Sequence, residues 1–155
     1  MRIWIDADAC PRGIKDFLFK AAMRLGVPAT LVANSGLFVP RSPLIRLVIV
    51  GGGIDEADRY IREHSAAGDL AVSADIPLAA ALVDRGVTVI DPRGTVYSEN
   101  NVKEALATRN LMQHLRESGE RTAGPPPLGP NDQARFANAF DREATRLIRA
   151  ARASR

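Results

Sequence analysis

Residues 2–16, RIWIDADACPRGIKD, decide how the fold is read, because an apolar run passes directly into a helical pattern. IWI (3–5) has the composition of a short buried strand. Pro11 suits the first position of a helix, since its missing N–H has no bonding role there. Two aspartates, Asp6 and Asp8, occupy the junction. The sequence thus contains a strand–helix unit whose joint carries two like charges.

Strand and helix patterns alternate along the rest of the chain. Apolar runs predict strands over 29–34, 45–50, 69–75 and 87–91. Helical spacing of apolar residues predicts helices over 11–25, 54–65 and 76–85, a long helix that follows Ser98, and a last helix through Phe136 and Leu147. GPPPLGP (124–130) contains too many prolines for regular structure and predicts a stiff linker.

Strands that alternate with helices indicate right-handed βαβ units and a mostly parallel sheet. The strands are nearly continuous apolar runs, which is typical of strands covered on both faces. We therefore predict an α/β fold, a three-layer α/β/α domain with a five-stranded sheet, over residues 1–120. Residues 121–155 follow as a Pro-rich linker and a C-terminal helical extension. The apolar stripe of Phe136, Phe140 and Leu147 predicts that this helix packs on the same domain.

Composition limits the classes of function. The 155 residues are 46% hydrophobic and 25% charged, ordinary values for a globular domain. A net charge of +3 is mild, so it permits an anionic partner such as nucleic acid without requiring one. The single cysteine excludes an intramolecular disulfide and favours a cytoplasmic location. No apolar run approaches the roughly 20 residues that span a bilayer. MRIWID lacks the features of a secretory signal, and a homo-oligomer remains open.

Aspartates follow three of the predicted strands. Asp6, Asp75 and Asp91 stand at the carboxyl ends, and Asp8 lies just beyond Asp6. In open α/β sheets, ligands bind outside the carboxyl ends of the strands. Gathered carboxylates repel one another unless protons or a cation are bound, and oxygen ligands suit hard cations such as Mg²⁺ and Mn²⁺. We therefore predict that Asp6, Asp8 and Asp75 are catalytic and hold Mg²⁺ or Mn²⁺.

A structural role competes with metal binding at each of these positions. Aspartate at a strand end often forms a turn or caps the next helix, and we assign Asp91, which precedes Pro92, to a turn. Asp55 and Asp58 lie at one helix start, where the helix dipole also favours acids. We add Asp58 to the predicted metal ligands and leave Asp55 outside that set.

Other polar residues near the strand ends predict contacts with a substrate. Arg12 and Lys15 follow the acids in the first turn of the helix, where such charges either hold phosphates or are simply solvated. Asn34 ends the second predicted strand. We assign Arg12, Lys15 and Asn34 to substrate binding.

Two weaker signals concern a glycine-rich turn and the cysteine. VIVGGGIDEAD (48–58) fails as a dinucleotide-binding fingerprint, because Glu56 stands where its last glycine belongs. Cys10 lies near a helix N-terminus, a position that acidifies a thiol. The chain has only His64 and His114 to pair with it, so a catalytic Cys–His pair is not predicted.

Several blocks of the sequence resemble a known bacterial family. The blocks are WIDADACPRGIKD (4–16), LVAN (31–34), DLAVSADIPLAAALVDRG (69–86), VIDPRG (89–94) and GPPPLGPNDQARFANAFDR (124–142). Together they are similar to the YaiI/YqxD family of small bacterial proteins over about residues 1–142. That family is in turn similar to the PIN-like and NYN nuclease domains.

The resemblance implies a PIN-like sheet in which strand 1 lies beside strand 4. Asp6 and Asp75 would then face each other as metal ligands. By the same resemblance Asp8 is a further ligand candidate, Asp58 is the helix acid, and Asn34 is the polar residue of the second strand.

Three functions are compatible with these expectations. The first is a metal-dependent nuclease that hydrolyses phosphodiester bonds, with RNA as the expected substrate rather than DNA. The second is a phosphatase of haloacid-dehalogenase type, in which Asp6 and Asp8 supply the nucleophile and the acid/base. That chemistry also needs a late lysine, and none of the chain's three lysines follows a late strand. The third is a non-catalytic nucleic-acid-binding module.

Overall fold

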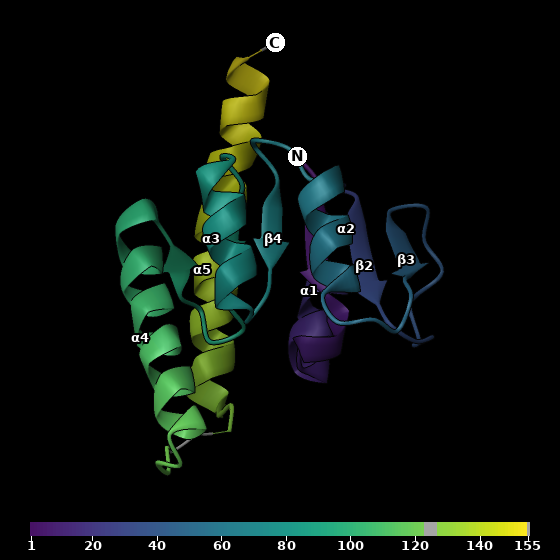
Figure 1. The fold of residues 1–155 in the computed structure, drawn as a ribbon. Coiled ribbons are helices and arrows are strands. Elements are labelled where there is room, and N and C mark those ends of the chain that lie inside the picture. Colours follow the sequence, from purple (N-terminus) through teal and green to yellow (C-terminus); the bar gives the residue numbers. More distant parts are fainter. Residues whose placement is uncertain (123–126, 155) are drawn as a thin grey trace.

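The computed structural model describes residues 1–122 and 127–154 (Figure 1). Its strands are β1 (Ile3–Asp6), β2 (Ala29–Ala33), β3 (Ile45–Ile49), β4 (Leu70–Val72), β5 (Thr88–Ile90) and β6 (Val96–Tyr97). Its helices are α1 (Arg12–Leu25), α2 (Glu56–His64), α3 (Ile76–Asp84), α4 (Glu99–Glu117) and α5 (Pro130–Ala153), with a 3₁₀ turn, η1 (Ala7–Ala9), after β1.

The strands form one sheet in the order β3-β2-β1-β4-β5-β6. The pairs from β3 through β5 are parallel, and β6 runs antiparallel to β5. The predicted α/β class and mostly parallel sheet are therefore confirmed. The predicted number of five strands is wrong, because the described residues add β6 at the edge. Two residues are too few to show the alternation of a strand, so the sequence shows only a turn before the next helix.

β1 lies at the point where the order of the strands reverses. The chain adds β2 and β3 on one side of β1, and β4 and β5 on the other. Ile5 of β1 pairs with Val72 of β4, so Asp6 lies beside the carboxyl end of β4. The expectation that strand 1 neighbours strand 4 is confirmed. Crevices at such switch points are where open α/β sheets bind ligands.

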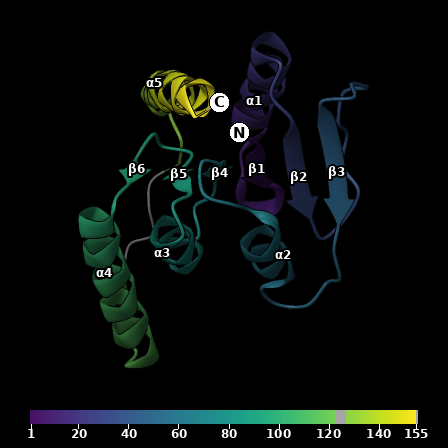
Figure 2. The same ribbon diagram turned by 90° about the horizontal axis from the view of Figure 1, so that it is seen from above.

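Helices pack on both faces of the sheet (Figure 2). Ile3 and Ile5 of β1 belong to an apolar cluster with α1 and α5, whereas Trp4 belongs to a second cluster with α2, α3 and α4. The division follows from the alternation of side chains along a strand. Burial on both faces explains why the strands are continuous apolar runs in the sequence.

α5 lies against α1 through a group of phenylalanine rings. Phe136 and Phe140 are fully buried. Each meets Phe17 of α1 edge-on, with ring centroids 5.8 and 5.5 Å apart. The turn between β5 and β6 also touches α5: an ideal Cβ on Gly94 would lie 2.8 Å from the backbone carbonyl carbon of Arg135. Only glycine therefore fits that turn without a shift of α5.

The helix ends follow signals that the sequence contains. Gly26 ends α1 in the left-handed conformation, with φ at 68°, which glycine adopts at little cost. Ser98 caps α4: its hydroxyl accepts the backbone N–H of Asn101, and the Asn101 side chain accepts the backbone N–H of Ser98. Both ends lie where the sequence predicts them.

The predicted linker GPPPLGP (124–130) lies partly outside the described residues, which resume at Pro127. The division of the chain at residue 120 stays a prediction. None of the helices in the described part of the chain combines the length and the apolar character that a membrane span requires.

Candidate functional site

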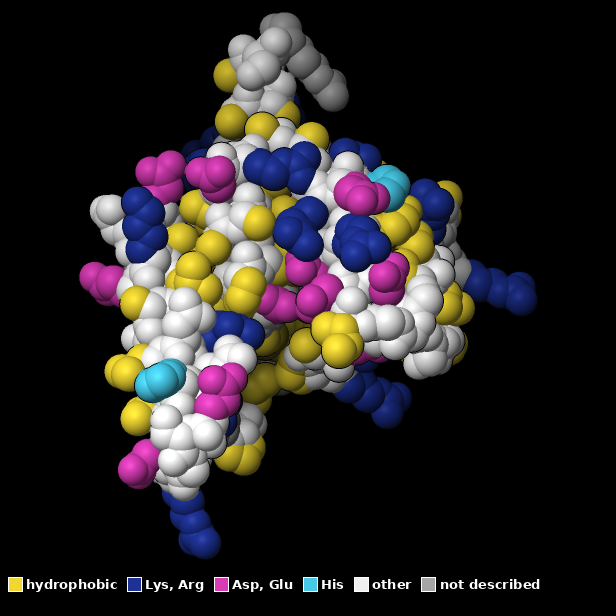
Figure 3. Space-filling view, in the orientation of Figure 1, with side chains coloured by type: hydrophobic (Ala, Val, Ile, Leu, Met, Phe, Trp, Pro, Cys, Tyr) yellow, Lys and Arg dark blue, Asp and Glu magenta, His cyan; other side chains and the backbone are white. Residues whose placement is uncertain are grey.

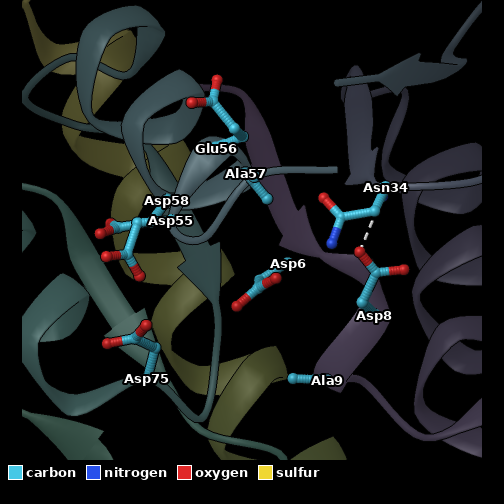
Figure 4. Close-up of a pocket in the computed structure, with 10 residues that line it drawn as sticks. Asp6, Asp8, Ala9, Asn34, Asp55, Glu56, Ala57, Asp58 and Asp75 are labelled. Atoms are coloured by element: carbon cyan, nitrogen blue, oxygen red, sulfur yellow. Dashed lines mark hydrogen bonds between the residues drawn. The ribbon is translucent and has the colours of Figure 1, made fainter. Parts of the chain in front are cut away.

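A cavity of about 270 Å³ opens at the carboxyl edge of the sheet, beside the ends of β1 and β4 (Figure 4). The described residues that line this cavity include several carboxylates but no lysine or arginine. The lining residues are Asp6, Asp8, Ala9, Asn34, Gly53, Asp55, Glu56, Ala57, Asp58 and Asp75. The acids come from the end of β1, from η1, from the start of α2 and from the residue before α3. Three separate segments, residues 6–8, 55–58 and 75, therefore bring carboxylates to one place.

Asp6 ends β1 and is half-buried. Its Oδ2 accepts a hydrogen bond of 3.0 Å from the hydroxyl of Ser73, the residue after β4. Burial raises the pKa of Asp6, the Ser73 hydrogen bond lowers it, and the charges of Asp75, Asp8 and Asp58 raise it further. The net shift is upward, so this carboxyl holds a proton more strongly than an exposed aspartate does.

Asp75 is fixed at the N-cap of α3. Its Oδ1 accepts a 3.0 Å hydrogen bond from the backbone N–H of Leu78, and its own N–H donates to the Ser73 hydroxyl. Capping uses one carboxylate oxygen and leaves Oδ2 for a ligand. Helix capping, which the sequence offers as an alternative to metal binding at Asp75, is therefore compatible with metal binding in the structure.

Asp55 and Asp58 form a three-carboxylate cluster with Asp75. One oxygen of each lies within 4.8 Å of the other two, and Figure 4 shows the three carboxylates facing one another. Asp55 precedes α2 in the left-handed conformation, with φ at 65°. Aspartate tolerates this region better than most residues. The residue with this left-handed backbone is thus one whose side chain lines the cavity.

Asp58 combines a buried oxygen with a raised pKa. Its Oδ2 lies 3.3 Å from a guanidinium nitrogen of Arg62, whereas its Oδ1 is buried and has no hydrogen-bond partner among the described residues. Burial raises the pKa of Asp58, Arg62 lowers it, and Asp75 and Asp55 raise it. A buried polar atom without a partner costs free energy. The orphaned oxygen and the all-carboxylate cluster together fit a hard divalent cation.

Asp8 lies away from the three-carboxylate cluster, with Asp6 between them in the view of Figure 4. It is exposed, and its Oδ2 accepts a 2.8 Å hydrogen bond from the backbone N–H of Asn34. Of the four predicted metal ligands, the structure groups Asp58 and Asp75 with Asp55. Asp6 and Asp8 line the same cavity outside that group. Asn34 also lines the cavity, and its assignment to substrate binding stays a prediction.

Arg12 and Lys15, assigned to substrate binding from the sequence, do not line this cavity. Both lie in the first turn of α1, and their assignment stays a prediction. Burial raises the pKa of the Cys10 thiol to about 12, although the charge of Lys15 lowers it. The expectation of an acidified thiol at Cys10 is wrong, because burial outweighs the nearby positive charge.

Three residues of the site were not predicted: Asp55, Glu56 and Ser73. Ser73 stands two positions before Asp75, and a serine hydroxyl readily accepts the backbone N–H of residue i+2. The local sequence therefore contained a signal for the contact between Ser73 and Asp75. Glu56 pairs with Arg59 at 3.4 Å. Figure 4 shows its carboxylate turned away from the three-carboxylate cluster.

Basic side chains lie beside the acidic ones on the face that Figure 3 shows. Arg59 and Arg62 of α2 form ion pairs with acids of their own helix. The Arg85 guanidinium donates to backbone carbonyls at the end of α2. These three arginines are therefore engaged by the protein itself.

Comparison with known proteins identifies relatives over nearly the whole chain. The family model described as "Uncharacterized BCR, YaiI/YqxD family" matches residues 4–146. A UPF0178 protein of Myxococcus xanthus is 51% identical over 149 residues, covering 96% of this chain and 97% of the relative. A UPF0178 protein of Legionella pneumophila is 50% identical over 142 residues, covering 92% of this chain and 96% of the relative.

No solved structure matches the chain significantly. The family match spans the acids of β1, η1, α2 and the α3 cap, and it extends into α5. With about half of the aligned residues identical to relatives over more than nine-tenths of each chain, this chain belongs to the YaiI/YqxD family.

Proposed function

We propose that the protein is a metal-dependent nuclease that hydrolyses phosphodiester bonds, with RNA as the expected substrate. The observation that carries this proposal is the three-carboxylate cluster of Asp55, Asp58 and Asp75, whose oxygens lie within 4.8 Å of one another. Asp58 also has a buried Oδ1 that finds no hydrogen-bond partner among the described residues. It lines a cavity at the switch point of an α/β sheet, where ligand sites are expected.

Mg²⁺ or Mn²⁺ held by these carboxylates would neutralise phosphate charge and lower the pKa of a water molecule. The chain's own part is to position the acids: the α3 cap fixes Asp75, and the Ser73 hydrogen bond fixes Asp6. In the metal-free protein the pKa of Asp6 is raised, chiefly by burial, so its carboxylate is a stronger base than an exposed one. As a water oxygen bonds to phosphorus and the phosphorus–oxygen bond to the leaving group breaks, Asp6 Oδ1 accepts the proton that the water loses. The leaving oxygen takes a proton from solvent.

The arrangement of strands supports the PIN-like likeness within this proposal. β1 lies beside β4, as the resemblance implies, and helices cover both faces of the sheet in the manner of a three-layer fold. Fold alone does not determine activity, so the carboxylate cluster carries the argument.

The phosphatase alternative lacks its lysine. That chemistry needs a cationic side chain near the nucleophile, and no lysine is among the described residues of the cavity. Asp8, which would serve as acid/base, is exposed and bonded to the Asn34 backbone. The other alternative is a nucleic-acid-binding module without turnover. A nuclease test that detects no cleavage would favour it.

Cleavage of end-labelled single-stranded RNA in Mn²⁺ tests the proposal. Asp75→Asn and Asp58→Asn remove a charged ligand and nearly preserve shape, and asparagine remains a good N-cap at position 75. Each variant should lose at least the 10–100-fold that loss of a supporting group near a metal typically costs. Asp16→Asn, at an exposed position on α1, is the matched control and should cleave at the wild-type rate.

Two results would contradict the proposal. Equal cleavage by wild type and both cluster variants would show that the activity lies elsewhere. If RNA, DNA and small phosphodiesters all stay intact while calorimetry detects Mn²⁺ binding, the protein binds without turnover.

A further inference from the structure

A second cavity adjoins the acidic one. The two share Asp6, Ala9 and Asp75 in their linings. On the far side of these residues the second cavity is lined by Ala74, Ile76 and Arg109. Among the described residues, Arg109 is the one lysine or arginine that lines either cavity. It belongs to α4, which packs on α3, so tertiary packing brings this charge to the two acids.

Within the described part of the chain, no carboxylate neutralises the charge of Arg109. Its guanidinium lies 3.2 Å from the side-chain oxygen of Gln113 and 3.4 Å from that of Asn110, and both partners are neutral amides. No described acid lies within ion-pair distance of it. The arginines of α2 and Arg85 differ in this respect, because they are held by carboxylates or by backbone carbonyls. Arg109 is thus available to an anion.

We propose that Arg109 binds a phosphate of the substrate at the junction of the two cavities. A planar guanidinium presents paired N–H donors that match phosphate oxygens. Carboxylates repel a phosphate, and a guanidinium at their edge adds an attraction for it beside that of the bound metal. Gln113 and Asn110 orient the guanidinium without taking up its charge. The inference rests on the proposed function and names the residue that holds the substrate anion.

Binding of a fluorescein-labelled single-stranded RNA 12-mer, measured by anisotropy in Ca²⁺, tests this role. Ca²⁺ takes carboxylate ligands as Mg²⁺ does. Arg109→Gln should weaken RNA binding about tenfold or more, the usual effect of a lost charge-assisted hydrogen bond. Arg109→Lys should keep part of the affinity. Arg116→Gln removes the same charge from the same helix outside both cavities and should change the affinity less than twofold.

A second measurement separates substrate binding from metal binding. Arg109→Gln should bind Mn²⁺ in calorimetry as well as wild type or more tightly, because a positive charge beside the acids is removed. A loss of Mn²⁺ binding equal to the loss of RNA binding would overturn the inference, since Arg109 would then act through the cluster.

The outcomes distinguish this inference from the proposed function. If wild type cleaves RNA and Arg109→Gln binds and cleaves equally well, the inference is overturned and the nuclease proposal stands. If RNA binding depends on Arg109 but nothing is cleaved, the inference stands and the nuclease proposal fails. If wild type does not bind the RNA, or if Arg116→Gln weakens binding as much as Arg109→Gln, the inference is overturned.

Discussion

The hydroxyl of Ser73 donates a 3.0 Å hydrogen bond to Oδ2 of Asp6, joining the ends of two neighbouring strands. The same hydroxyl accepts the backbone N–H of Asp75. A hydroxyl has one donor and two acceptor sites, so both bonds form at once. Ser73 is 1% exposed. One buried hydroxyl therefore sets the positions of two cavity carboxylates relative to each other.

Ser73→Ala should lower the free energy of unfolding by roughly 1–3 kcal/mol, because it leaves the Asp75 N–H and the Asp6 carboxylate without this partner. Ser65→Ala is the matched control: Ser65 is also buried, but its hydroxyl has no partner among the described residues. That change should be neutral or stabilising. Urea unfolding at pH 7 measures both, and equal losses in the two variants would show that the Ser73 bonds contribute nothing.

The proximity of Asp6 and Asp75 to one cavity is predictable, because it depends on local patterns and one rule of topology. Apolar runs identify β1 and β4, and the rule for parallel sheets places the acids at their ends on one edge. Asp6 and Asp75 accordingly line one cavity. The cap at Ser98 is local as well, since both of its bonds join residues three apart.

Stability should depend on pH through Asp6. Its pKa is raised in the folded state, chiefly by burial, so the folded protein binds the proton more strongly than the unfolded chain. Ionisation then costs stability as pH rises from the unfolded value of about 3.9 through the raised value. The full cost is present above the raised value, and well below pH 3.9 it vanishes.

Asp6→Asn removes that cost and keeps an oxygen that can accept the Ser73 hydrogen bond. In metal-free buffer at pH 7 its Tm should exceed that of wild type, because asparagine carries no charge for burial and the neighbouring acids to disfavour. The difference should shrink as pH falls toward 4. If Asp6→Asn is less stable than wild type at pH 7, burial and like charge do not make ionised Asp6 unfavourable in the folded protein.

Cys10 should react slowly with iodoacetamide in the folded protein. Burial raises the pKa of its thiol to about 12, so at pH 8 it holds on the order of 1,000-fold less thiolate than a thiol of ordinary pKa. Alkylation followed by mass spectrometry should show little modification in native buffer and rapid modification in urea. Rapid modification of the native protein at pH 8 would instead support the acidified Cys10 thiol that the sequence suggests.

The remaining parts of the site depend on tertiary geometry that no local pattern contains. Asp55 joins the cluster because the backbone enters the left-handed region just before α2, whereas the sequence explains an acid there by the helix dipole alone. Arg109 reaches its cavity through the packing of α4 on α3. Periodicity predicts the long helix, but it does not reveal which exposed arginine faces the acids.

The packing of α5 can be tested through the ring contacts between α5 and α1. Phe136 is fully buried and meets Phe17 edge-on. Phe136→Ala should lower the free energy of unfolding by about 3–5 kcal/mol, the usual loss for a buried phenylalanine. Phe38→Ala removes the same atoms from a ring that is 85% exposed, so it should change stability by no more than about 0.5 kcal/mol.

Limited trypsin digestion gives an independent measure of the same contact. In the native protein the arginines of α5 should be cleaved slowly, because cleavage requires the helix to leave α1. Phe136→Ala should speed the loss of α5, and Phe38→Ala should not. If wild type loses everything after residue 122 rapidly while the rest of the chain stays intact, α5 does not stay docked in solution, and the contacts with Phe17 contribute little to stability.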